Sequence, residues 1–380
     1  MKVIHVHKIT GISGSEGHLL TLLPALRNAG VDARFLGLDV PGSDAPRFYA
    51  ALGAAGVPFE QVRCTADMSP RMAADVIKAV RRARPDLLHT HLVHGDIYGA
   101  IASRATAVPF VSSRHNDDRY LLGPFRHVDR LFARRAGKII AISDAVRLFL
   151  EQAGLPRRKL VTVHYGLDAL PDAPSELKPE DLGIAPEAPL VLAIGRLIAQ
   201  KDHVTMLHAF ARTRKDHPGA VLAILGSGPL EDETRGLVRQ LGLDGAVLMP
   251  GRLEIRDWLD RADMFVHTSR WEGFGMVLLE AMLAGLPIVA TRISAVPEVV
   301  ADDVTGLLVE PGDVTGLSAA LSRLLNDPER AAALGRAGRE RARTSFSIAR
   351  MVAGTTAVYG AATAAPSSEP TPGRQGAQGG

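Results

Sequence analysis

The sequence predicts an α/β protein with two doubly wound parallel-sheet domains that face each other across a cleft. The chain has 380 residues, which is too long for one ordinary hydrophobic core and makes two domains the default. Short aliphatic runs alternate with helical stretches in both halves, a pattern typical of parallel sheets covered by helices. A proline-containing segment without apolar periodicity separates the halves and indicates a linker.

Residues 1–170 are expected to form the N-terminal domain. Its predicted strands are Val3–His7, Ala33–Gly37, Leu87–Thr90, Phe110–Ser113, Ile139–Ile142 and Leu160–Val163. Residues 171–188 are expected to form the linker, because they contain four prolines and only short helical signals. Ligands of open α/β sheets bind at the carboxyl ends of the strands, so the cleft between two such domains is the expected site.

Residues 189–346 are expected to form the C-terminal domain. Its predicted strands are Leu190–Ile194, Ala220–Leu225, Ala246–Leu248, Met264–His267, Ile288–Ala290 and Gly306–Val309. A last helix over residues 347–362 is expected to cross back to the N-terminal domain. Residues 363–380 are rich in Pro, Gly, Ser and Gln and are expected to be disordered.

Composition narrows the class of protein. Hydrophobic content of 46% and charged content of 22% are values of globular proteins. Aromatic residues make up only 5%, which argues against a surface that stacks nucleic-acid bases. The single cysteine, Cys64, excludes an internal disulfide and fits the buried core of a cytosolic protein. The sequence shows neither a signal-peptide pattern nor an apolar run of membrane-spanning length, so we expect a cytoplasmic protein.

Charge is distributed unevenly along the chain. Residues 1–170 carry 23 Lys and Arg against 15 Asp and Glu, whereas the remainder carries 21 against 26. The segment from Arg119 to Arg135 mixes aromatic residues, leucines and arginines. It fits a core-packed helix with a basic outer face, which is the interpretation we favour. The alternative is an interfacial helix that contacts an anionic membrane, which would place the protein at the inner face of that membrane.

Two glutamates eight positions apart form the most informative motif. Glu272 belongs to a loop broken by Gly273 and Gly275, and Glu280 is expected about one turn inside the helix that follows. The free N–H groups and the positive dipole end of such a helix attract phosphate. Carboxylates on both sides of a bound diphosphate could accept hydroxyls of a ribose and of a hexose. The motif therefore fits a nucleotide-sugar, although a solvated acid and an ordinary helix acid explain the pair in isolation.

A second motif follows the first predicted strand of the C-terminal domain. Gly195 and Arg196 precede Lys201 by a few residues, just before an expected helix. A guanidinium can bind two phosphate oxygens, and an ammonium adds a compact charge beside it. Two such cations can replace a metal ion when a diphosphate leaves. A solvated surface pair explains the motif equally well if the segment is taken alone.

Two further glycine-rich loops follow predicted strands. Gly14 lies in the first of these, where backbone N–H groups could approach phosphate or sugar oxygens. Its spacing matches neither a dinucleotide fingerprint nor a Walker loop. Gly228, in the Gly226-Ser-Gly-Pro turn, could line a nucleotide pocket, although a plain turn is the favoured interpretation.

Histidines provide a further candidate. His115 follows a predicted strand end, so it is expected to face the cleft and to bond a sugar hydroxyl or transfer a proton. His89, His91 and His94 could form a metal site, but no fourth ligand is readable and we do not favour it. No Asp-x-Asp pair stands at a strand end, and no nucleophile elbow appears. We expect no metal.

Taken together, these motifs resemble family 4 of the retaining glycosyltransferases, which have the GT-B fold. The resemblance extends to about residue 360 and is carried by Gly195-Arg196 with Lys201, Gly226-Ser-Gly228-Pro, Glu272 through Glu280, and Val296-Pro-Glu298 before Thr305-Gly306. It implies two Rossmann-like domains, a nucleoside-diphosphate sugar such as a UDP- or GDP-sugar as donor substrate, and no metal cofactor. It also implies an acceptor hydroxyl on a glycan, a lipid or a small-molecule glycoside.

The resemblance also implies roles for individual residues. Arg196 and Lys201 would hold the donor diphosphate, Glu280 the ribose and Glu272 the transferred hexose. The backbone of Gly273, Phe274 and Gly275 would contact sugar hydroxyls. His115 matches the cleft histidine of the family.

The chain departs from the family pattern at two positions. Gly14 matches the second glycine of the N-terminal loop, but Ser13 stands before it where the family usually has another glycine. Tyr165 stands where the family commonly has asparagine. This second departure concerns the contact at the interdomain hinge.

The resemblance implies hexosyl transfer with retention of the anomeric configuration, by a front-face route without a covalent nucleophile. Two alternatives remain open at this point. One is a GT-B-fold nucleotide-sugar epimerase, which would need carboxylates beside His115, and Asp117 and Asp118 are the nearby candidates. The other is a non-catalytic protein that binds sugar nucleotides.

Overall fold

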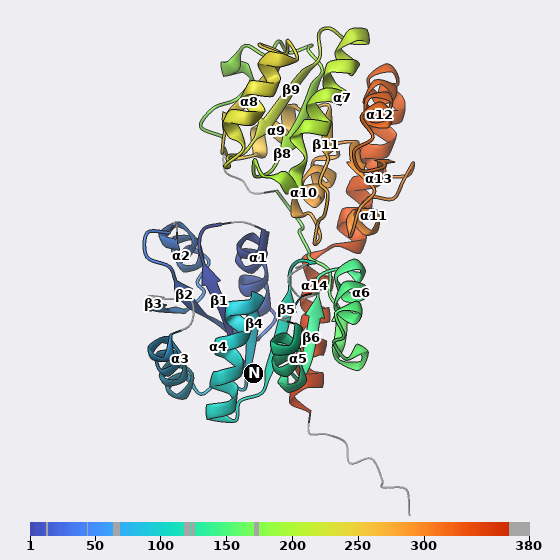
Figure 1. Ribbon diagram of the computed structural model, residues 1–380. Helices are drawn as coiled ribbons and strands as arrows, with labels where there is room; N and C mark the ends of the chain where they lie inside the picture. Colours follow the sequence, from blue (N-terminus) through green and yellow to red (C-terminus); the bar gives the residue numbers. More distant parts are fainter. Residues whose placement is uncertain are drawn as a thin grey trace, which may run out of the picture.

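The computed structural model describes residues 1–364 except 13, 44, 64–68, 118–122, 124–125 and 171–174. The described chain forms two α/β domains, one above the other in Figure 1, which confirms the predicted fold class. The expectations for Ser13, Cys64 and Asp118, for the first residues of the linker and for the tail beyond residue 364 lie outside the described residues.

The N-terminal sheet has the strand order β3-β2-β1-β4-β5-β6-β7 with parallel pairing throughout its described strands. Its strands are β1 (Lys2–Ile9), β2 (Asp32–Asp39), β3 (Phe59–Arg63), β4 (Leu87–His91), β5 (Phe110–Arg114), β6 (Lys138–Ala141) and β7 (Leu160–Thr162). The sequence analysis missed β3. This edge strand buries only Val62 and exposes Phe59, so it lacks the apolar run that identified the other strands.

Helices cover both faces of this sheet (Figure 1). They are α1 (Gly14–Asn28), α2 (Ala45–Ala54), α3 (Pro70–Ala83), α4 (Leu92–Thr106), α5 (Arg126–Arg135) and α6 (Asp144–Gln152). In the described part of α5, Ala133 is buried, whereas Leu131, Arg134 and Arg135 are exposed. The helix therefore packs one face on the core and presents the other to solvent.

The C-terminal sheet has the strand order β10-β9-β8-β11-β12-β13, again parallel. Its strands are β8 (Leu190–Ile194), β9 (Val221–Leu225), β10 (Val247–Gly251), β11 (Met264–His267), β12 (Ile288–Thr291) and β13 (Gly306–Val309). Its helices are α7 (His203–Asp216), α8 (Glu231–Gln240), α9 (Arg256–Arg261), α10 (Met276–Ala284), α11 (Val296–Val299), α12 (Val314–Asn326) and α13 (Pro328–Ser345). All six strands coincide, within a few residues at their ends, with the predicted ones.

The chain crosses between the domains twice, and the two crossings lie against each other. After α13 the chain returns as α14 (Ile348–Thr363), which packs on α1, β5 and β6 of the N-terminal domain (Figure 1). Leu167, on the outgoing crossing, donates its N–H to the Phe346 carbonyl at 2.9 Å. Asp168 accepts from the Ile348 N–H at 2.8 Å. Hydrogen bonds between the two crossings therefore make one compact connection.

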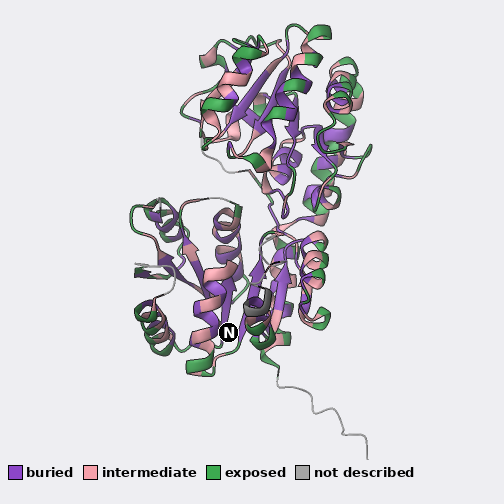
Figure 2. Ribbon diagram, in the orientation of Figure 1, coloured by how far each residue is buried: buried purple, intermediate pink, exposed green. Residues whose placement is uncertain are grey.

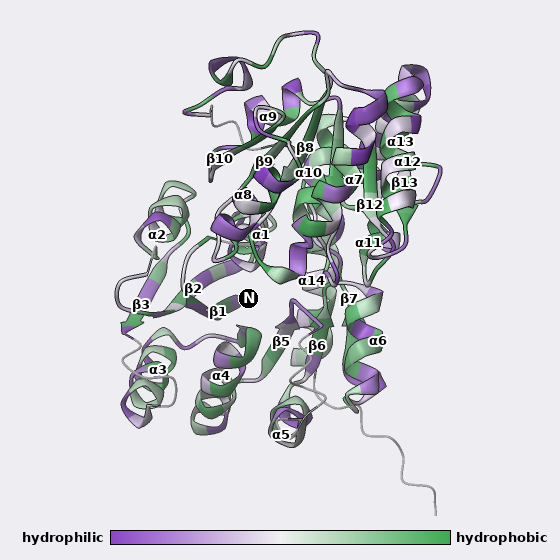
Figure 3. Ribbon diagram, turned by 45° about the horizontal axis from the view of Figure 1, so that its top comes forward, coloured by the Kyte–Doolittle hydropathy of each residue, from purple (hydrophilic) through white to green (hydrophobic). Residues whose placement is uncertain are grey.

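Burial follows the layer plan in both domains. Figure 2 shows the central strands buried and the outer helix faces exposed. Figure 3 shows the central strands of the C-terminal sheet as mostly hydrophobic, whereas β1 and β2 of the N-terminal sheet include hydrophilic segments. Across the residues that the structure describes, none of the helices has the length and apolar character needed to cross a bilayer. The loops at the carboxyl ends of the strands carry the polar residues considered next.

Candidate active site at the domain junction

A glycine loop of the C-terminal domain touches the N-terminal domain directly. Ser143, at the start of α6, donates its hydroxyl to the Gly273 carbonyl at 2.8 Å. A Cβ at Gly273 would collide with the carbonyl oxygen of His115, which follows β5. Gly273 therefore permits a backbone-to-backbone approach that another residue would block. This contact brings Glu272 and His115 to the same region.

The N-terminus of α6 is capped from the opposite domain. Glu298 of α11 accepts from the N–H groups of Asp144 and Ala145 at 2.7 and 2.6 Å. His164 lies 3.1 Å from the same carboxylate. An anion at a helix N-terminus satisfies free N–H groups and interacts favourably with the dipole. Glu298 thus stabilises the junction between the domains.

Helix α10 begins at the glycine loop, as the sequence predicts. Gly275 precedes it with a left-handed φ of 86°, a conformation that favours glycine. The Phe274 ring is buried and packs edge-on against Tyr165 and Phe346, with centroids 5.2 and 5.6 Å away. The Phe274 side chain therefore serves the junction, and its backbone remains the part that can meet a ligand.

Glu272 and Lys201 form a largely buried ion pair. Lys201 Nζ lies 2.5 Å from Glu272 Oε2, and their side chains are 16% and 12% exposed. His267 Nε2, at the end of β11, lies 3.2 Å from the same oxygen. Burial alone would raise the pKa of Glu272, but the Lys201 ammonium and His267 outweigh it and leave that pKa below its ordinary value. Glu272 is therefore a carboxylate held in place by a cation.

Glu280 is the opposite case. It lies in the second turn of α10 and has no hydrogen-bond or ion-pair partner among the described residues. Burial raises its pKa to about 7, although its side chain retains partial contact with solvent. An unpaired carboxylate in such a place can accept hydroxyls of a ligand.

Arg196 is exposed and has no partner within the described part of the chain. The Gly195 that precedes it leaves room for the aliphatic part of Lys201, which a Cβ would approach to 3.3 Å. Arg196 and Lys201 thus follow the same strand end, one free and one paired.

The Gly226–Gly228 turn packs backbone to backbone on this loop. A Cβ at Gly226 or Gly228 would collide with the carbonyl oxygens of Gly195 or Leu197. Leu197 also donates its N–H to the Ser227 carbonyl at 3.0 Å. The glycines of the turn therefore shape the loop that carries Arg196.

Gly14 is the first residue of α1, and a Cβ there would meet nothing within 4 Å. Glu16, in the first turn of α1, accepts from His7 Nε2 at 3.1 Å and from Ser15 at 3.0 Å. Steric crowding within the protein does not require glycine at position 14, whereas open space there leaves room for a ligand.

His115 is buried, with both ring nitrogens engaged inside the protein. Its Nε2 lies 3.0 Å from His91 Nδ1, and its Nδ1 lies 2.5 Å from the Tyr165 hydroxyl. Burial and the neighbouring His18 hold the pKa of His115 well below its usual value. Both ring nitrogens have partners within the protein, so the role of His115 toward a sugar hydroxyl or a proton stays a prediction.

The histidine cluster in the structure differs from the His89, His91 and His94 trio that the sequence analysis considered and did not favour. His89 and His91 lie together on β4, but the third member is His5 of β1, while His94 Nε2 lies 3.4 Å from Lys8 Nζ. The missed residue, His5 of β1, lies far from β4 in the sequence. A usable signal was present, because β1 and β4 each carry two histidines in alternate positions.

Two Rossmann-like sheets, joined at this junction and returning through a C-terminal helix, define the GT-B fold. The family model of the glycosyl transferases group 1 matches residues 174–341, and that of glycosyltransferase family 4 matches residues 12–169. The chain belongs to this family of glycosyltransferases.

Three similar proteins illustrate the relationship. The alpha-maltose-1-phosphate synthase of Mycobacterium tuberculosis is 28% identical, with 91% of this chain and 95% of that protein covered. The glycogen synthase of the same organism is 31% identical, with 74% and 70% covered. Among solved structures, Anabaena HepE in complex with UDP and glucose has a TM-score of 0.81 at 23% identity, covering 94% of this chain and 99% of that one.

Proposed function

We propose that the protein is a retaining glycosyltransferase that moves a hexosyl unit from a UDP- or GDP-sugar to an acceptor hydroxyl. The observation that carries this proposal is the contrast between Glu272 and Glu280 on either side of the α10 N-terminus. Glu272 is fixed beside a cation, whereas Glu280 has no partner among the described residues. A diphosphate at the helix start would place a sugar near each carboxylate.

The donor would be held by charges on the C-terminal domain. Arg196 is free to bind phosphate oxygens bidentately, and Lys201 neutralises the leaving diphosphate from beside Glu272. Glu280 would accept the ribose hydroxyls and Glu272 those of the hexose. The backbone of Gly273, Phe274 and Gly275 would add contacts to the hexose. These cations perform the role of a metal ion, so we propose that no metal is required.

The chemical step would proceed without a covalent enzyme intermediate. Glu272 is bound to Lys201 and lies beside His267, which suits an acceptor of hydroxyl hydrogens better than a nucleophile. On the front-face route, the acceptor oxygen attacks the anomeric carbon as the diphosphate departs on the same face. A diphosphate oxygen then takes the acceptor proton. Closure of the domains would exclude water and align the two substrates.

The acceptor would meet the N-terminal domain, and we propose a glycan, a lipid or a small-molecule glycoside. The names of relatives include both alpha-maltose-1-phosphate synthase and a GDP-mannose-dependent phosphatidylinositol monomannoside mannosyltransferase of Mycolicibacterium smegmatis. We propose a cytoplasmic location. Exposed Leu131, Arg134 and Arg135 on α5 support a peripheral contact with anionic membrane, which cosedimentation with anionic and neutral vesicles tests.

A thermal-shift panel of UDP-, GDP- and ADP-sugars tests the donor class, because a ligand that binds the folded state raises the melting temperature. Incubation with the radiolabelled sugar nucleotide that binds, without acceptor, then separates the activities. Slow hydrolysis supports the transferase. Epimerised sugar would indicate an epimerase, and an unchanged bound ligand would indicate a non-catalytic binding protein.

A further inference from the structure

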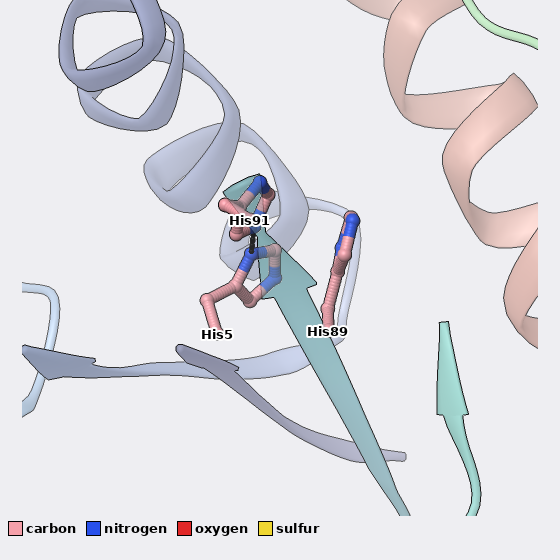
Figure 4. Close-up of side chains that lie close together, drawn as sticks. All are labelled: His5, His89 and His91. Atoms are coloured by element: carbon pink, nitrogen blue, oxygen red, sulfur yellow. Dashed lines mark hydrogen bonds between the residues drawn. The ribbon is translucent and has the colours of Figure 1, made fainter. Parts of the chain in front are cut away.

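Two neighbouring strands bring four histidines together in the core of the N-terminal domain. His5 and His7 alternate on β1, and His89 and His91 alternate on β4. The parallel register pairs His5 with His89, and all four are at most 1% exposed. Figure 4 shows His5, His89 and His91 on these strands, with the hydrogen bond from His5 to His91.

One end of a continuous hydrogen-bond chain runs through the return helix α14. Ser113 Oγ lies 2.7 Å from His89 Nε2. His89 Nδ1 lies 2.6 Å from the Tyr359 hydroxyl, which lies 3.2 Å from His5 Nε2. Tyr359 belongs to α14 and is fully buried, so the return crossing supplies a link in the chain.

The other end of the chain reaches the domain junction. His5 Nδ1 lies 2.9 Å from His91 Nε2, and His91 Nδ1 lies 3.0 Å from His115 Nε2. His115 Nδ1 lies 2.5 Å from the Tyr165 hydroxyl. Tyr165 packs against Phe274 of the opposite domain. The chain therefore connects α14 to the loop that carries Glu272.

The geometry argues against a metal site at His5, His89 and His91. Every ring nitrogen of the three already lies within hydrogen-bonding distance of a protein group. Two nitrogens on one tetrahedral zinc ion stand roughly 3.3 Å apart, given bonds of about 2.0 Å, whereas His5 Nδ1 and His91 Nε2 are closer. The His5 and His91 rings are also stacked, with 14° between their planes, so they do not point at a common centre.

Neutral rings couple the tautomers along the chain. Burial lowers the pKa of His5 to about 3 and holds those of His89, His91 and His115 well below the usual value. A neutral imidazole has one donor and one acceptor nitrogen. If one ring donates toward Tyr165, each ring before it must donate in the same sense. The chain therefore has two states of opposite polarity.

Electrostatics at the Tyr165 end favours one polarity. The carboxylates of Glu16 and Glu272 lie close enough to add to burial in raising the pKa of Tyr165, and negative charge attracts a hydroxyl hydrogen rather than its lone pairs. In that polarity Ser113 donates to His89, and His5, His91 and His115 each donate from Nδ1. Tyr165 then accepts from His115 and directs its own hydrogen away from the chain.

A second unsatisfied group adjoins Tyr165. The His18 ring stacks on the Tyr165 ring with centroids 4.0 Å apart. His18 is buried, and its Nδ1 has no hydrogen-bond partner among the described residues. A buried polar atom without a partner is costly and points to a ligand or water. The Tyr165 hydroxyl and His18 Nδ1 thus offer a donor and a polar atom on two stacked rings.

We propose that His5, His91 and Tyr359 are positioning residues that fix His115 in its Nδ1–H tautomer, so that Tyr165 presents its hydroxyl hydrogen to a ligand oxygen at the junction. His18 Nδ1 would contact the same ligand. His115 then acts on the ligand only through Tyr165. The tautomer chain does not depend on the proposed function, whereas the identity of the ligand as a substrate of glycosyl transfer rests on it.

The first test measures tautomers in the full chain without ligand. Long-range ¹H–¹⁵N correlation of ¹⁵N-histidine protein is expected to show His5, His91 and His115 neutral, each protonated at Nδ1. Tyr359→Phe removes one hydroxyl from the middle of the chain and is expected to let His115 populate both tautomers. Tyr98→Phe is the matched control, because this buried tyrosine bonds the Ser69 N–H outside the chain. It should leave the His115 signals unchanged.

The second test uses UDP-glucose as the probe, without acceptor, and measures kcat and KM for its hydrolysis. Tyr165→Phe is expected to lower kcat/KM about tenfold, and Tyr359→Phe about fivefold, as for the loss of one hydrogen bond. The double variant should lose little more than Tyr165→Phe, because both changes act through one hydroxyl. Tyr98→Phe should retain wild-type kinetics.

The outcomes separate this proposal from the proposed function. Unchanged His115 tautomers in Tyr359→Phe, protonation at Nε2 in the wild type, or stoichiometric Zn²⁺ binding that shifts His5, His89 and His91 would each overturn the tautomer chain. Additive losses in the double variant would overturn the link to Tyr165. A wild type that turns over no sugar nucleotide would contradict the proposed function, while the tautomer measurement would still decide the chain.

Discussion

The two faces of the domain junction bring together polar groups of opposite kinds. On the C-terminal face, Lys201 and Glu272 form an ion pair, and Arg196 carries a charge exposed to solvent. On the N-terminal face, His115 and its neighbours are buried and neutral, and they are joined by hydrogen bonds rather than by charge. The first arrangement suits a diphosphate, and the second suits uncharged hydroxyls.

The comparison also explains why one face could be read from sequence and the other could not. The charged groups of the C-terminal face follow strand ends within short, glycine-marked segments. The neutral network needs residues from β1, β4, β5 and α14 together. Variants that alter each face separately therefore test whether the charged face and the neutral face have different functions.

The largest effect is expected for Lys201→Ala on the charged face. Removing the cation beside Glu272 should lower kcat about 10²- to 10³-fold, as for loss of one electrostatic stabiliser of a transition state, with a smaller change in KM. Steady-state kinetics with the donor found by thermal shift measures it. Lys215→Ala, on the exposed face of α7, is the control. A kcat within twofold of wild type would remove Lys201 from the chemical step.

The second-largest effect is expected on stability, for a substitution at the backbone contact between the two faces. In Gly273→Ala, the added methyl group must displace the His115 carbonyl, which should lower the free energy of unfolding by about 2–3 kcal/mol. Urea unfolding measures this loss. Gly219→Ala is the control, because nothing lies within 4 Å of its Cβ. Equal free energies of unfolding in the two variants would show that the junction accommodates the added methyl group without loss of stability.

Much of the fold was predictable because buried strands appear in the sequence as local apolar runs. Twelve of the described strands were expected from apolar runs, and β3 escaped because its edge position buries only Val62. The placement of Glu280 inside α10 followed from the glycines before it. Tyr165 was noticed as a departure, but its partners come from distant segments, His18 from α1 and His115 from the loop after β5. No local pattern encodes such a meeting of distant segments.

The pH dependence of donor binding distinguishes Glu280 from Glu272. Because burial raises the pKa of Glu280 to about 7, its ionised form becomes dominant only above that pH. If the ionised carboxylate accepts the ribose hydroxyls, UDP-glucose affinity should rise about tenfold between pH 6 and pH 8. Isothermal titration calorimetry measures it.

Glu280→Gln should flatten that rise, whereas Glu272, whose pKa is lowered, contributes no slope in this range. A slope retained in Glu280→Gln would assign the titration to another group. The stability of the fold depends on pH with the opposite sign. A carboxyl whose pKa is raised in the folded state stabilises the fold most below its ordinary value near 4.5 and loses that contribution as pH rises through 7.

The smallest effect on stability is expected at Glu298, which caps the N-terminus of α6 from the opposite domain. Glu298→Gln keeps the shape of the side chain but removes the negative charge at the α6 N-terminus, where Asp144 and Ala145 donate to it. The variant should lose about 0.5–1 kcal/mol of unfolding free energy, and the loss should shrink at high salt because the charge interacts with a partly exposed dipole. Urea unfolding at low and high salt measures both effects. Glu187→Gln, an exposed acid without an ion-pair partner among the described residues, is the control for charge removal alone. Equal losses in the two variants would mean that Glu298 acts through general surface charge, and the capping of α6 would then contribute nothing specific to holding the charged and neutral faces together.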